Sequence, residues 1–268
     1  MGNQQQLRDT VEYKTYDIPK NTMKTLMTIS KKFVSSVVFG NMRVVNPSHT
    51  AMFQFTPSEE FPKMDNIYFD FDSISTEILE AHNTLEIGES DTALIFRING
   101  LNFSQLNVCN GLNTITFNGL DFNTFDSYVL NIQGRKFKNL IKMYCATDCT
   151  VFYAYRDKDG SQIGVGTEIF PSVGYDLSDA GEPLLGLFPQ DELRKILTII
   201  PDGEITLKFK EDYPMEIEWT DTMNNRYQYV LAPRIPSDDV IETFRKMCSG
   251  GLNIQKKVKK EDKKEESQ

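Results

Sequence analysis

The residues that could carry chemistry in this chain are a few closely spaced carboxylates, cysteines and glycines. Asp70 and Asp72 have the DxD spacing that can hold Mg²⁺, but they precede an expected helix and are better explained as its N-terminal cap. The segment Asp157–Gly160 resembles a fragment of a calcium loop, yet no glutamate follows at the offset that bidentate ligation needs. We therefore interpret that segment as a hairpin turn.

The cysteines and glycines give no stronger signal. Cys145 and Cys149 have a CxxxC spacing, but no second pair completes a zinc site, and the two histidines are far apart in the sequence. Gly164 and Gly166 lie in an expected strand without the third glycine of a dinucleotide-binding loop, which favours a β-bulge. The motifs of serine hydrolases, zinc proteases and P-loop enzymes do not occur. We expect no catalytic site, no metal, no cofactor and no enzymatic activity.

The composition indicates a folded chain that must concentrate its basic residues if it is to bind nucleic acid. The 268 residues, of which 40% are hydrophobic and 25% charged, suit one large domain or two of ordinary size. The formal net charge of −9 repels DNA and RNA unless basic residues are gathered on one surface. No apolar run approaches the roughly 20 residues of a membrane-spanning helix. The N-terminus also lacks the apolar region of a signal peptide, so we expect an intracellular protein without membrane contact.

Alternating apolar and polar residues predict strands through much of the chain. In the stretch 204–236, for example, Ile205, Leu207 and Phe209 alternate with polar residues, which predicts a sheet with one buried face. Helices are expected at about 17–33, 72–81, 133–146 and 189–200, and strands at 11–16, 36–39, 42–45, 50–56, 67–71, 84–87, 93–98, 127–132, 150–155, 162–167, 173–177, 184–188, 204–210, 215–219 and 227–231.

The order of these elements is a repeat. It reads β-α-β-β-β twice in the second half of the chain and twice in the first half, where the last strand is uncertain within residues 100–125. Four such units predict an α+β fold.

Three of the four expected helices carry basic residues opposite their apolar face, when positions are projected at about 100° per residue. These residues are Lys20, Lys24 and Lys31 in the first helix, Arg135, Lys138 and Lys142 in the third, and Arg194 and Lys195 in the fourth. The second helix departs from the pattern with Glu77 and Glu80. The basic side chains either solvate separate helix faces or form a surface that contacts phosphates without reading sequence.

Two segments resemble proliferating cell nuclear antigen (PCNA), the DNA sliding clamp of eukaryotes and archaea. Residues 227–236, YQYVLAPRIP, resemble the family's C-terminal strand and its Leu-Ala-Pro-basic-Ile ending. Residues 45–55, VNPSHTAMFQF, resemble its Met-Asp-Ser-Ser-His segment and the strand after it. Four β-α-β-β-β units are also the architecture of this family, with two units in each of two similar domains. The match of element order covers about residues 11–236.

The resemblance implies a ring, usually a homotrimer, whose helices line a hole around double-stranded DNA and whose sheets lie outside. The eight basic residues would then contact DNA independently of its sequence. Clamp domains are implied at 11–105 and 126–237, with a connector at 106–125. The composition itself indicates a flexible, polar N-terminus at 1–10 and an extension at 238–268, in which a short helix at 238–247 precedes a disordered charged tail. The implied partners are a clamp loader, a DNA polymerase, and other replication and repair proteins.

The resemblance also implies an outer groove that binds short peptides of those partners. The positions that match the family's groove are Val45, His49, Thr50, Pro214, Val230, Leu231, Ala232 and Pro233. Val230 departs from the aromatic residue that the family commonly has before Leu-Ala-Pro. The divergence suggests a viral or otherwise specialised clamp, which would act at the site of replication in a nucleus or a viral compartment.

Three functions stay open from the sequence. The chain could be a homotrimeric sliding clamp that serves as a polymerase processivity factor. It could be a clamp-fold subunit of a heterotrimeric checkpoint-type or transcription-coupling ring. It could also be a β-rich structural protein that does not bind DNA, in which case the helix charges are incidental. We favour the first hypothesis because it accounts for both the repeat and the basic helix faces.

Overall fold

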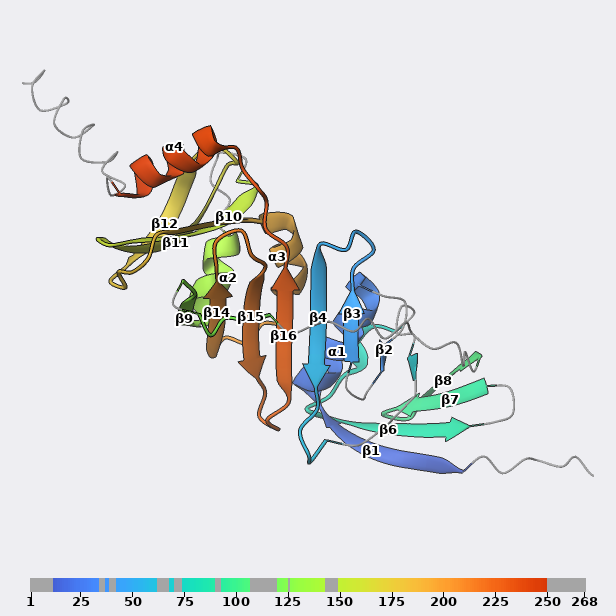
Figure 1. Cartoon of the computed structure of the whole chain (residues 1–268). Coiled ribbons are helices and arrows are strands. Elements are labelled where there is room, and N and C mark those ends of the chain that lie inside the picture. The colour runs from blue at the N-terminus through green and yellow to red at the C-terminus, as the bar shows by residue number, and fades with distance from the viewer. Residues whose placement is uncertain are drawn as a thin grey trace, which may run out of the picture. The chain divides into compact units, whose positions relative to one another are not determined.

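The structure is a computed structural model, and it describes residues 12–33, 37–38, 42–61, 68–69, 74–89, 93–106, 120–124, 126–142 and 149–249. The chain forms two compact units, drawn in Figure 1. The first takes its described residues from 1–47, 54–116 and 220–226, and the second from 48–53, 117–219 and 227–268. The predicted N-terminal segment 1–10, most of the predicted connector, the charged tail, Asp70, Asp72 and Cys145 lie outside the described residues. The domain boundaries proposed from the sequence stay predictions.

The first unit is built on an antiparallel sheet. Its strands are, in spatial order, β1 (Tyr13–Pro19), β6 (His82–Glu89), β7 (Ala93–Ile98) and β8 (Leu101–Leu106). The helix α1 (Lys20–Phe33) packs against β1 and β6. Two short strands, β2 (Val37–Val38) and β5 (Tyr68–Phe69), pair with each other. The strand β3 (Met42–Val45) lies beside the second half of β4 (Ala51–Thr56), where Arg43 Nε donates to Gln54 Oε1 at 3.0 Å.

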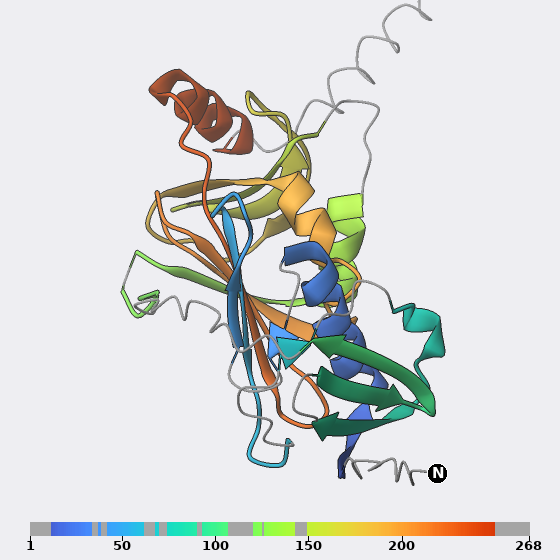
Figure 2. The same cartoon turned by 90° about the vertical axis from the view of Figure 1, so that its right-hand side faces the viewer.

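The second unit contains two sheets and three helices in its described part. One sheet has the order β12 (Pro171–Leu177), β11 (Gly160–Gly166), β10 (Val151–Asp157), β13 (Leu184–Pro189). The other contains the first half of β4, then β16 (Arg226–Leu231), β15 (Met215–Thr220), β14 (Glu204–Phe209) and β9 (Tyr128–Gln133). The helices α2 (Gly134–Lys142) and α3 (Gln190–Ile196) lie side by side, as Figure 2 shows. The helix α4 (Asp238–Ser249) packs against β10 and β12.

The predicted repeat is present in the order of the elements. Along the described chain the order β-α-β-β-β occurs four times, with the 3₁₀ turn η1 (Thr76–Ile78) in place of the second helix, and α4 follows the last repeat. The α+β prediction is confirmed. The strand that the sequence leaves uncertain within residues 100–125 is β8.

The helix expected at about 72–81 is wrong. From Ile74 onward the chain makes only the short turn η1, which the side chain of Ser75 caps by accepting from the backbone N–H of Glu77. Two asparagine side chains then capture the backbone groups that a helix would need. Asn99 Nδ2 donates to the Ile78 carbonyl at 3.1 Å, and Asn83 Oδ1 accepts from the Glu80 N–H at 3.0 Å. These side chain–backbone bonds replace helical ones and turn the chain into β6.

The predicted hairpin turn and the predicted β-bulge are both confirmed. The Asp157 carboxylate accepts from the N–H groups of Asp159 (2.8 Å) and Gly160 (3.1 Å), which closes the hairpin between β10 and β11. The register of β11 against β12 shifts between Val165 and Gly166, as expected for a β-bulge. Among the described residues no group of three or more His, Cys, Asp and Glu side chains could hold a metal ion. No helix in that part of the chain is long and apolar enough to cross a membrane.

The start of α2 is fixed by the loop that follows α3. The N–H groups of Gly134 and Arg135 have no acceptor within their own helix, and they donate to the carbonyls of Gly203 (2.6 Å) and Asp202 (3.2 Å). This close approach leaves no space for a side chain at Gly134, because a Cβ there would lie 2.1 Å from the Pro201 carbonyl oxygen. The first turn of α2 and the loop at 201–203 therefore form one rigid joint.

Gly134→Ala should lower the free energy of unfolding of the protein by about 1–3 kcal/mol, because the added methyl group forces the helix away from the loop. Gly203→Ala is the matched control, since a Cβ at Gly203 meets nothing within 4 Å. We expect that control to stay within about 0.5 kcal/mol of the wild type. Urea unfolding followed by circular dichroism measures both, and equal losses in the two variants would contradict the close contact at Gly134.

Candidate functional site

The predicted basic residues of α1 lie on its exposed side. Lys20, Lys24 and Lys31 are exposed, whereas Leu26 and Ile29 on the opposite side are fully buried in the first unit. The ammonium of Lys31 donates to the carbonyl of Ile74, so this lysine also holds the chain that leads into η1. The two lysines nearer the start of the helix are the ones best placed to meet an anion from solvent.

The basic residues of α2 differ from one another. Arg135 and Lys142 are exposed, and the apolar residues Phe137 and Leu140 are fully buried, as the periodicity predicts. The side chain of Lys138, however, is only 17% exposed. It pairs with the carboxylate of Asp202 and also donates to the Ile200 carbonyl at 3.2 Å. Lys138 therefore ties α2 to the loop at 200–203 rather than presenting a bare charge.

Asp202 adds a negative charge to the basic side of α2 that the helix pattern does not reveal. Hydrogen bonding and charge attraction from Lys138 are the main causes that lower the pKa of this carboxyl, and the charges of Arg135 and Lys142 contribute in the same direction. The carboxylate thus lies within the field of Arg135, Lys138 and Lys142, the three predicted basic residues of α2. It reduces the net charge of these three side chains from three to two; the fourth basic residue of the helix, Lys136, lies over the Tyr175 ring.

The short helix α3 contributes less positive charge than expected. Its predicted basic residues Arg194 and Lys195 are half-buried, and Lys195 pairs with Glu192 at 2.7 Å. Its first turn carries Asp191 and Glu192. Of the basic residues predicted on the helices of the second unit, those that are exposed are therefore mainly Arg135 and Lys142.

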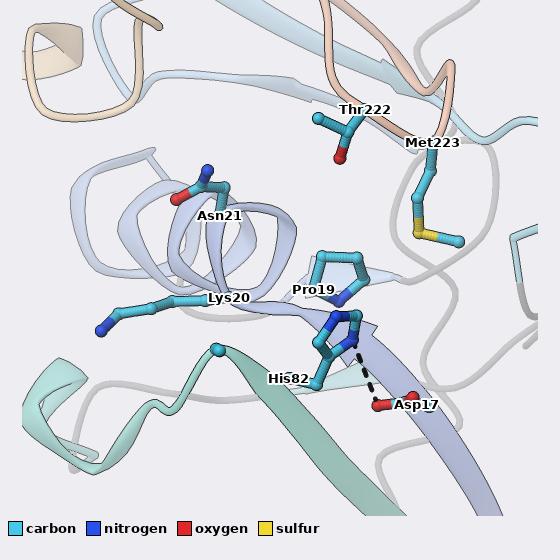
Figure 3. Close-up of a pocket in the computed structure, with 8 residues that line it drawn as sticks. Asp17, Pro19, Lys20, Asn21, His82, Thr222 and Met223 are labelled. Atoms are coloured by element: carbon cyan, nitrogen blue, oxygen red, sulfur yellow. Dashed lines mark ion pairs between the residues drawn. The ribbon is translucent and has the colours of Figure 1, made fainter.

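The first unit has a pocket of about 390 Å³ beside the start of α1. Figure 3 shows its lining: Asp17, Pro19, Lys20, Asn21, Ala81, His82, Thr222 and Met223. Asp17 and His82 form an exposed pair at 3.6 Å. The turn that carries Thr222 and Met223 is held in place by Asp221. The carboxylate of Asp221 accepts from Thr22 Oγ1 at 2.8 Å and from the N–H groups of Met223 and Asn225.

The predicted groove residues of the second unit gather at one end of the sheet that contains β14, β15 and β16. Because these strands are antiparallel, the turn at 210–214, the residues after β16 and the residues before β4 all lie at the same end. The N–H of Ala232 donates to the Thr50 carbonyl at 2.8 Å, and that of Arg234 donates to the Leu187 carbonyl at 2.7 Å. The segment 231–234 is thus held in an extended conformation.

The exposure of the predicted groove residues sorts them into two groups. Thr50, Pro214, Ala232 and Pro233 are half-buried and His49 is exposed, whereas Val230 and Leu231 are buried. Val45 is half-buried and belongs to the first unit. Two residues of the predicted connector also reach this end: Asp121 N donates to Tyr213 Oη at 3.2 Å, and the Phe122 ring packs edge-on to that tyrosine.

Comparison with solved structures identifies the fold. PCNA of A. fulgidus bound to the C-terminal region of FEN-1 superposes with a TM-score of 0.66 at 17% identity, over 84% of this chain and 99% of that one. PCNA of Thermococcus kodakaraensis gives 0.65 at 16%, over 83% and 100%. The PCNA2–PCNA3 complex of Sulfolobus tokodaii gives 0.64 at 10%, over 82% and 99%. The sequence matches no protein-family model and no curated protein.

The chain has the sliding-clamp fold. The match spans nearly the full length of these clamps, and about a sixth of this chain lies outside it. At this level of identity the likeness shows the fold, and the roles of individual residues rest on the geometry above.

Three exposed apolar side chains belong to segments near the end of the sheet where the predicted groove residues gather. The sequence did not predict them as part of the groove. Ile169 and Phe170 lie in the turn between β11 and β12, and Ile235 follows the Leu-Ala-Pro segment with 83% of its surface exposed. An ion pair between Glu168 and Arg234 joins the two segments. The sequence offers only an apolar pair outside any expected strand and an isoleucine in the segment Pro-Arg-Ile-Pro, and neither reveals the ion pair between Glu168 and Arg234.

The pairing of Asp202 with Lys138 makes stability depend on pH at the acidic end. The folded-state pKa of Asp202 lies below its ordinary value of 3.8. The ionised carboxylate therefore stabilises the folded protein above about pH 4, and this contribution is lost as the pH falls through the folded-state pKa. The urea midpoint of the wild type should exceed that of Asp202→Asn at about pH 6, and the difference should close below about pH 3.

Asp179→Asn is the control for that experiment, because it removes the same charge from an exposed position on the connection between β12 and β13. It should leave the midpoint near that of the wild type at each pH. If Asp179→Asn and Asp202→Asn behave alike, the ion pair with Lys138 does not contribute to stability.

Proposed function

We propose that this protein is a subunit of a DNA sliding clamp, which encircles double-stranded DNA as a ring and tethers a polymerase and other replication or repair proteins to it. The observation that carries the proposal is the sliding-clamp fold, matched over almost the whole length of known clamps. The exposed lysines and arginine of α1 and α2 support it, because they are basic groups on helices of an otherwise acidic chain.

The proposed mechanism depends on topology rather than affinity. A closed ring cannot leave DNA sideways, so its contacts with phosphates need only be weak and independent of sequence. Side chains such as Lys24 and Lys142, on long flexible stems, can exchange one phosphate for the next as the ring slides. The carboxylate of Asp202 favours the same behaviour, since it reduces the charge that α2 offers to the backbone.

Edge strands support the assembly of a ring. Within the described chain, β8 is an edge of its sheet in the first unit and β12 is an edge of its sheet in the second. Unpaired backbone groups along an edge are a template for pairing with another chain. Pairing of β8 in one copy with β12 in the next would satisfy both edges and close a ring by a head-to-tail contact.

The sheet of the second unit that contains β14 and β15 suits an outer wall. Lys208 is enclosed by Glu216 and Glu218, each at 2.7 Å, so these three side chains together carry one net negative charge. An acidic wall discourages DNA from binding outside the ring.

A partner peptide would bind at the end of that sheet. The half-buried Ala232 and Pro233 and the exposed Ile169, Phe170 and Ile235 offer apolar contacts around a fixed extended segment. The A. fulgidus clamp binds the C-terminal region of FEN-1, and a peptide of that type would insert apolar anchors here.

A heteromeric ring is the second candidate. The Sulfolobus tokodaii structure is a complex of two different PCNA chains with the same fold. A chain of this kind would remain a monomer or dimer alone and close a ring only with its relatives. Light scattering at micromolar concentration distinguishes the two: a mass near three times the 30.7 kDa of the chain supports the homotrimer, and a smaller mass supports a heteromer.

Charge reversal on the helices tests the DNA interface. The double variant Lys24→Glu, Lys142→Glu should bind a short DNA duplex at least tenfold more weakly than the wild type, because attraction to phosphates is replaced by repulsion. The logarithm of its binding constant should also fall less steeply with the logarithm of salt concentration, by about 0.9 for each phosphate that the variant no longer neutralises. Fluorescence anisotropy of labelled duplex at several salt concentrations measures both quantities.

The control for charge is Lys158→Glu, Lys246→Glu, which makes the same change at exposed positions on the hairpin after β10 and on α4. It should keep the affinity and salt dependence of the wild type. If the control weakens binding as much as the helix variant, DNA responds to total charge and the helix interface is wrong.

A single substitution tests the groove. The C-terminal peptide of FEN-1 serves as the probe, and Ala232→Asp should weaken its binding at least tenfold, because an apolar anchor would then bury an unpaired carboxylate. Asn131→Asp adds the same charge on β9, where the side chain accepts a hydrogen bond from Thr206 Oγ1 at 2.9 Å, and should leave binding unchanged. Equal affinity of all three proteins in a titration would place the peptide elsewhere.

A further inference from the structure

The sheet β12-β11-β10-β13 is buried on both faces, which is unusual for an antiparallel sheet. On one face Phe152 of β10 packs edge-on against Phe137 of α2, with ring centres 5.6 Å apart. The other face, called here the α4 face, is formed by Val151, Tyr153, Tyr155, Leu185 and Leu187, all at most 6% exposed. Figure 1 shows α4 lying across these strands.

The helix α4 binds this face with a short series of anchors. Phe244 and Cys248, four residues apart, are buried against it, and Val240 and Ile241 pack one turn earlier. The ring of Phe244 is edge-on to Tyr153 at 5.7 Å. Residues spaced by three or four positions on one side of a helix are the usual way in which an amphipathic helix occupies an apolar groove.

The α4 face keeps its shape by interactions that do not involve α4. Tyr153 Oη donates to Gln162 Oε1 at 2.6 Å, and Gln162 Nε2 donates to Asp176 Oδ1 at 2.6 Å. Gly164 and Gly174 leave room for the tyrosine, because a Cβ at either position would lie within 2.5 Å of its hydroxyl oxygen. The site for Phe244 is therefore preformed by the sheet itself.

The ion pairs of α4 lie at the rim, and the contact of its Cys248 is buried. Arg245 pairs with Glu211 at 2.8 Å between half-exposed side chains, and Glu242 pairs with Lys246 of the same helix at 2.7 Å. Cys248 Sγ contacts Gln162 Oε1 at 3.6 Å. The chain reaches α4 through Ile235, Pro236 and Ser237, which run along the surface. The helix is thus held mainly by apolar anchors that can leave together.

We infer that the α4 face is an exchangeable docking site for an amphipathic helix, with α4 as its resident occupant and a partner helix of the same anchor pattern as its competitor. Such a helix carries an aromatic residue at the position of Phe244, small or branched apolar residues four positions before and after it, and a basic residue beside Glu211. This inference does not depend on DNA binding or on the proposed peptide groove. It gives the protein a second docking site on a different sheet.

The full-length chain reports undocking through Cys248. Burial raises the pKa of this thiol to about 12, so it reacts with a thiol reagent only after α4 leaves. The protein used for labelling has Cys109, Cys145 and Cys149 replaced by serine, so that Cys248 is its one cysteine. A reference protein for global unfolding also has Cys248→Ser and carries Ala154→Cys, at a fully buried position on β10.

Labelling of Cys248 should be at least tenfold faster than labelling of the cysteine at 154, and its rate should depend less steeply on urea, because undocking exposes less surface than unfolding. If both thiols react at the same rate with the same urea dependence, α4 leaves only when the whole protein unfolds, and the inference is wrong.

A peptide tests exchange directly. Labelled peptide 237–250 should bind full-length Phe244→Ala, whose resident helix lacks its main anchor, at least tenfold more tightly than it binds the wild type, where α4 competes at high effective concentration. The same peptide carrying Phe244→Ala should not bind. Equal, weak binding of the peptide to both proteins would contradict an exchangeable site. Phe244→Leu serves as the receptor if the alanine variant is unstable.

Discussion

The contact between the apolar side of α2 and the aromatic cluster beneath it sets the orientation of the helix and therefore of its charges. Phe137 packs against Phe152, which in turn stacks on Phe209 and contacts Phe188, so the helix is locked over both sheets of the second unit. Burying these rings requires that Arg135 and Lys142 face away from the sheets. The basic surface is thus a consequence of packing, and no separate interaction is needed to hold it outward.

The same constraint explains why the surface is only moderately basic. Lys138 lies at the border of the buried and exposed sides of α2, where its ammonium would be poorly hydrated, and it is satisfied by Asp202 and the Ile200 carbonyl. The ion pair also holds the loop whose carbonyls cap the start of α2. One carboxylate therefore serves the helix terminus and limits the positive field of α2, which agrees with the weak phosphate contacts of the proposed function.

The sequence predicts those features that depend on local periodicity. Alternation in residues such as Ile205, Leu207 and Phe209 gives the strands, and helical spacing gives the buried sides of α1 and α2. What it cannot predict depends on groups that are distant along the chain. The expected second helix fails because Asn83 and Asn99 capture its backbone. The role of Lys138 depends on an aspartate 64 positions later, and Arg234, next to the exposed Ile235, pairs with Glu168 only through folding.

The run Val151–Tyr155 contains a signal that periodicity alone does not interpret. Five consecutive apolar or aromatic residues in a strand predict burial on both faces, yet an antiparallel sheet covered by helices on one side has its other side in water. The sheet must therefore be covered by something that the repeat does not supply, and the chain supplies it as α4, after the last β-α-β-β-β unit. The apolar face and the helix that covers it depend on each other. Without α4, Tyr153 and Leu185 would be exposed to water, and without these residues Phe244 would have no apolar surface to pack against. Within the C-terminal extension, α4 is thus part of the folded protein, and the cover is one that a second helix could imitate.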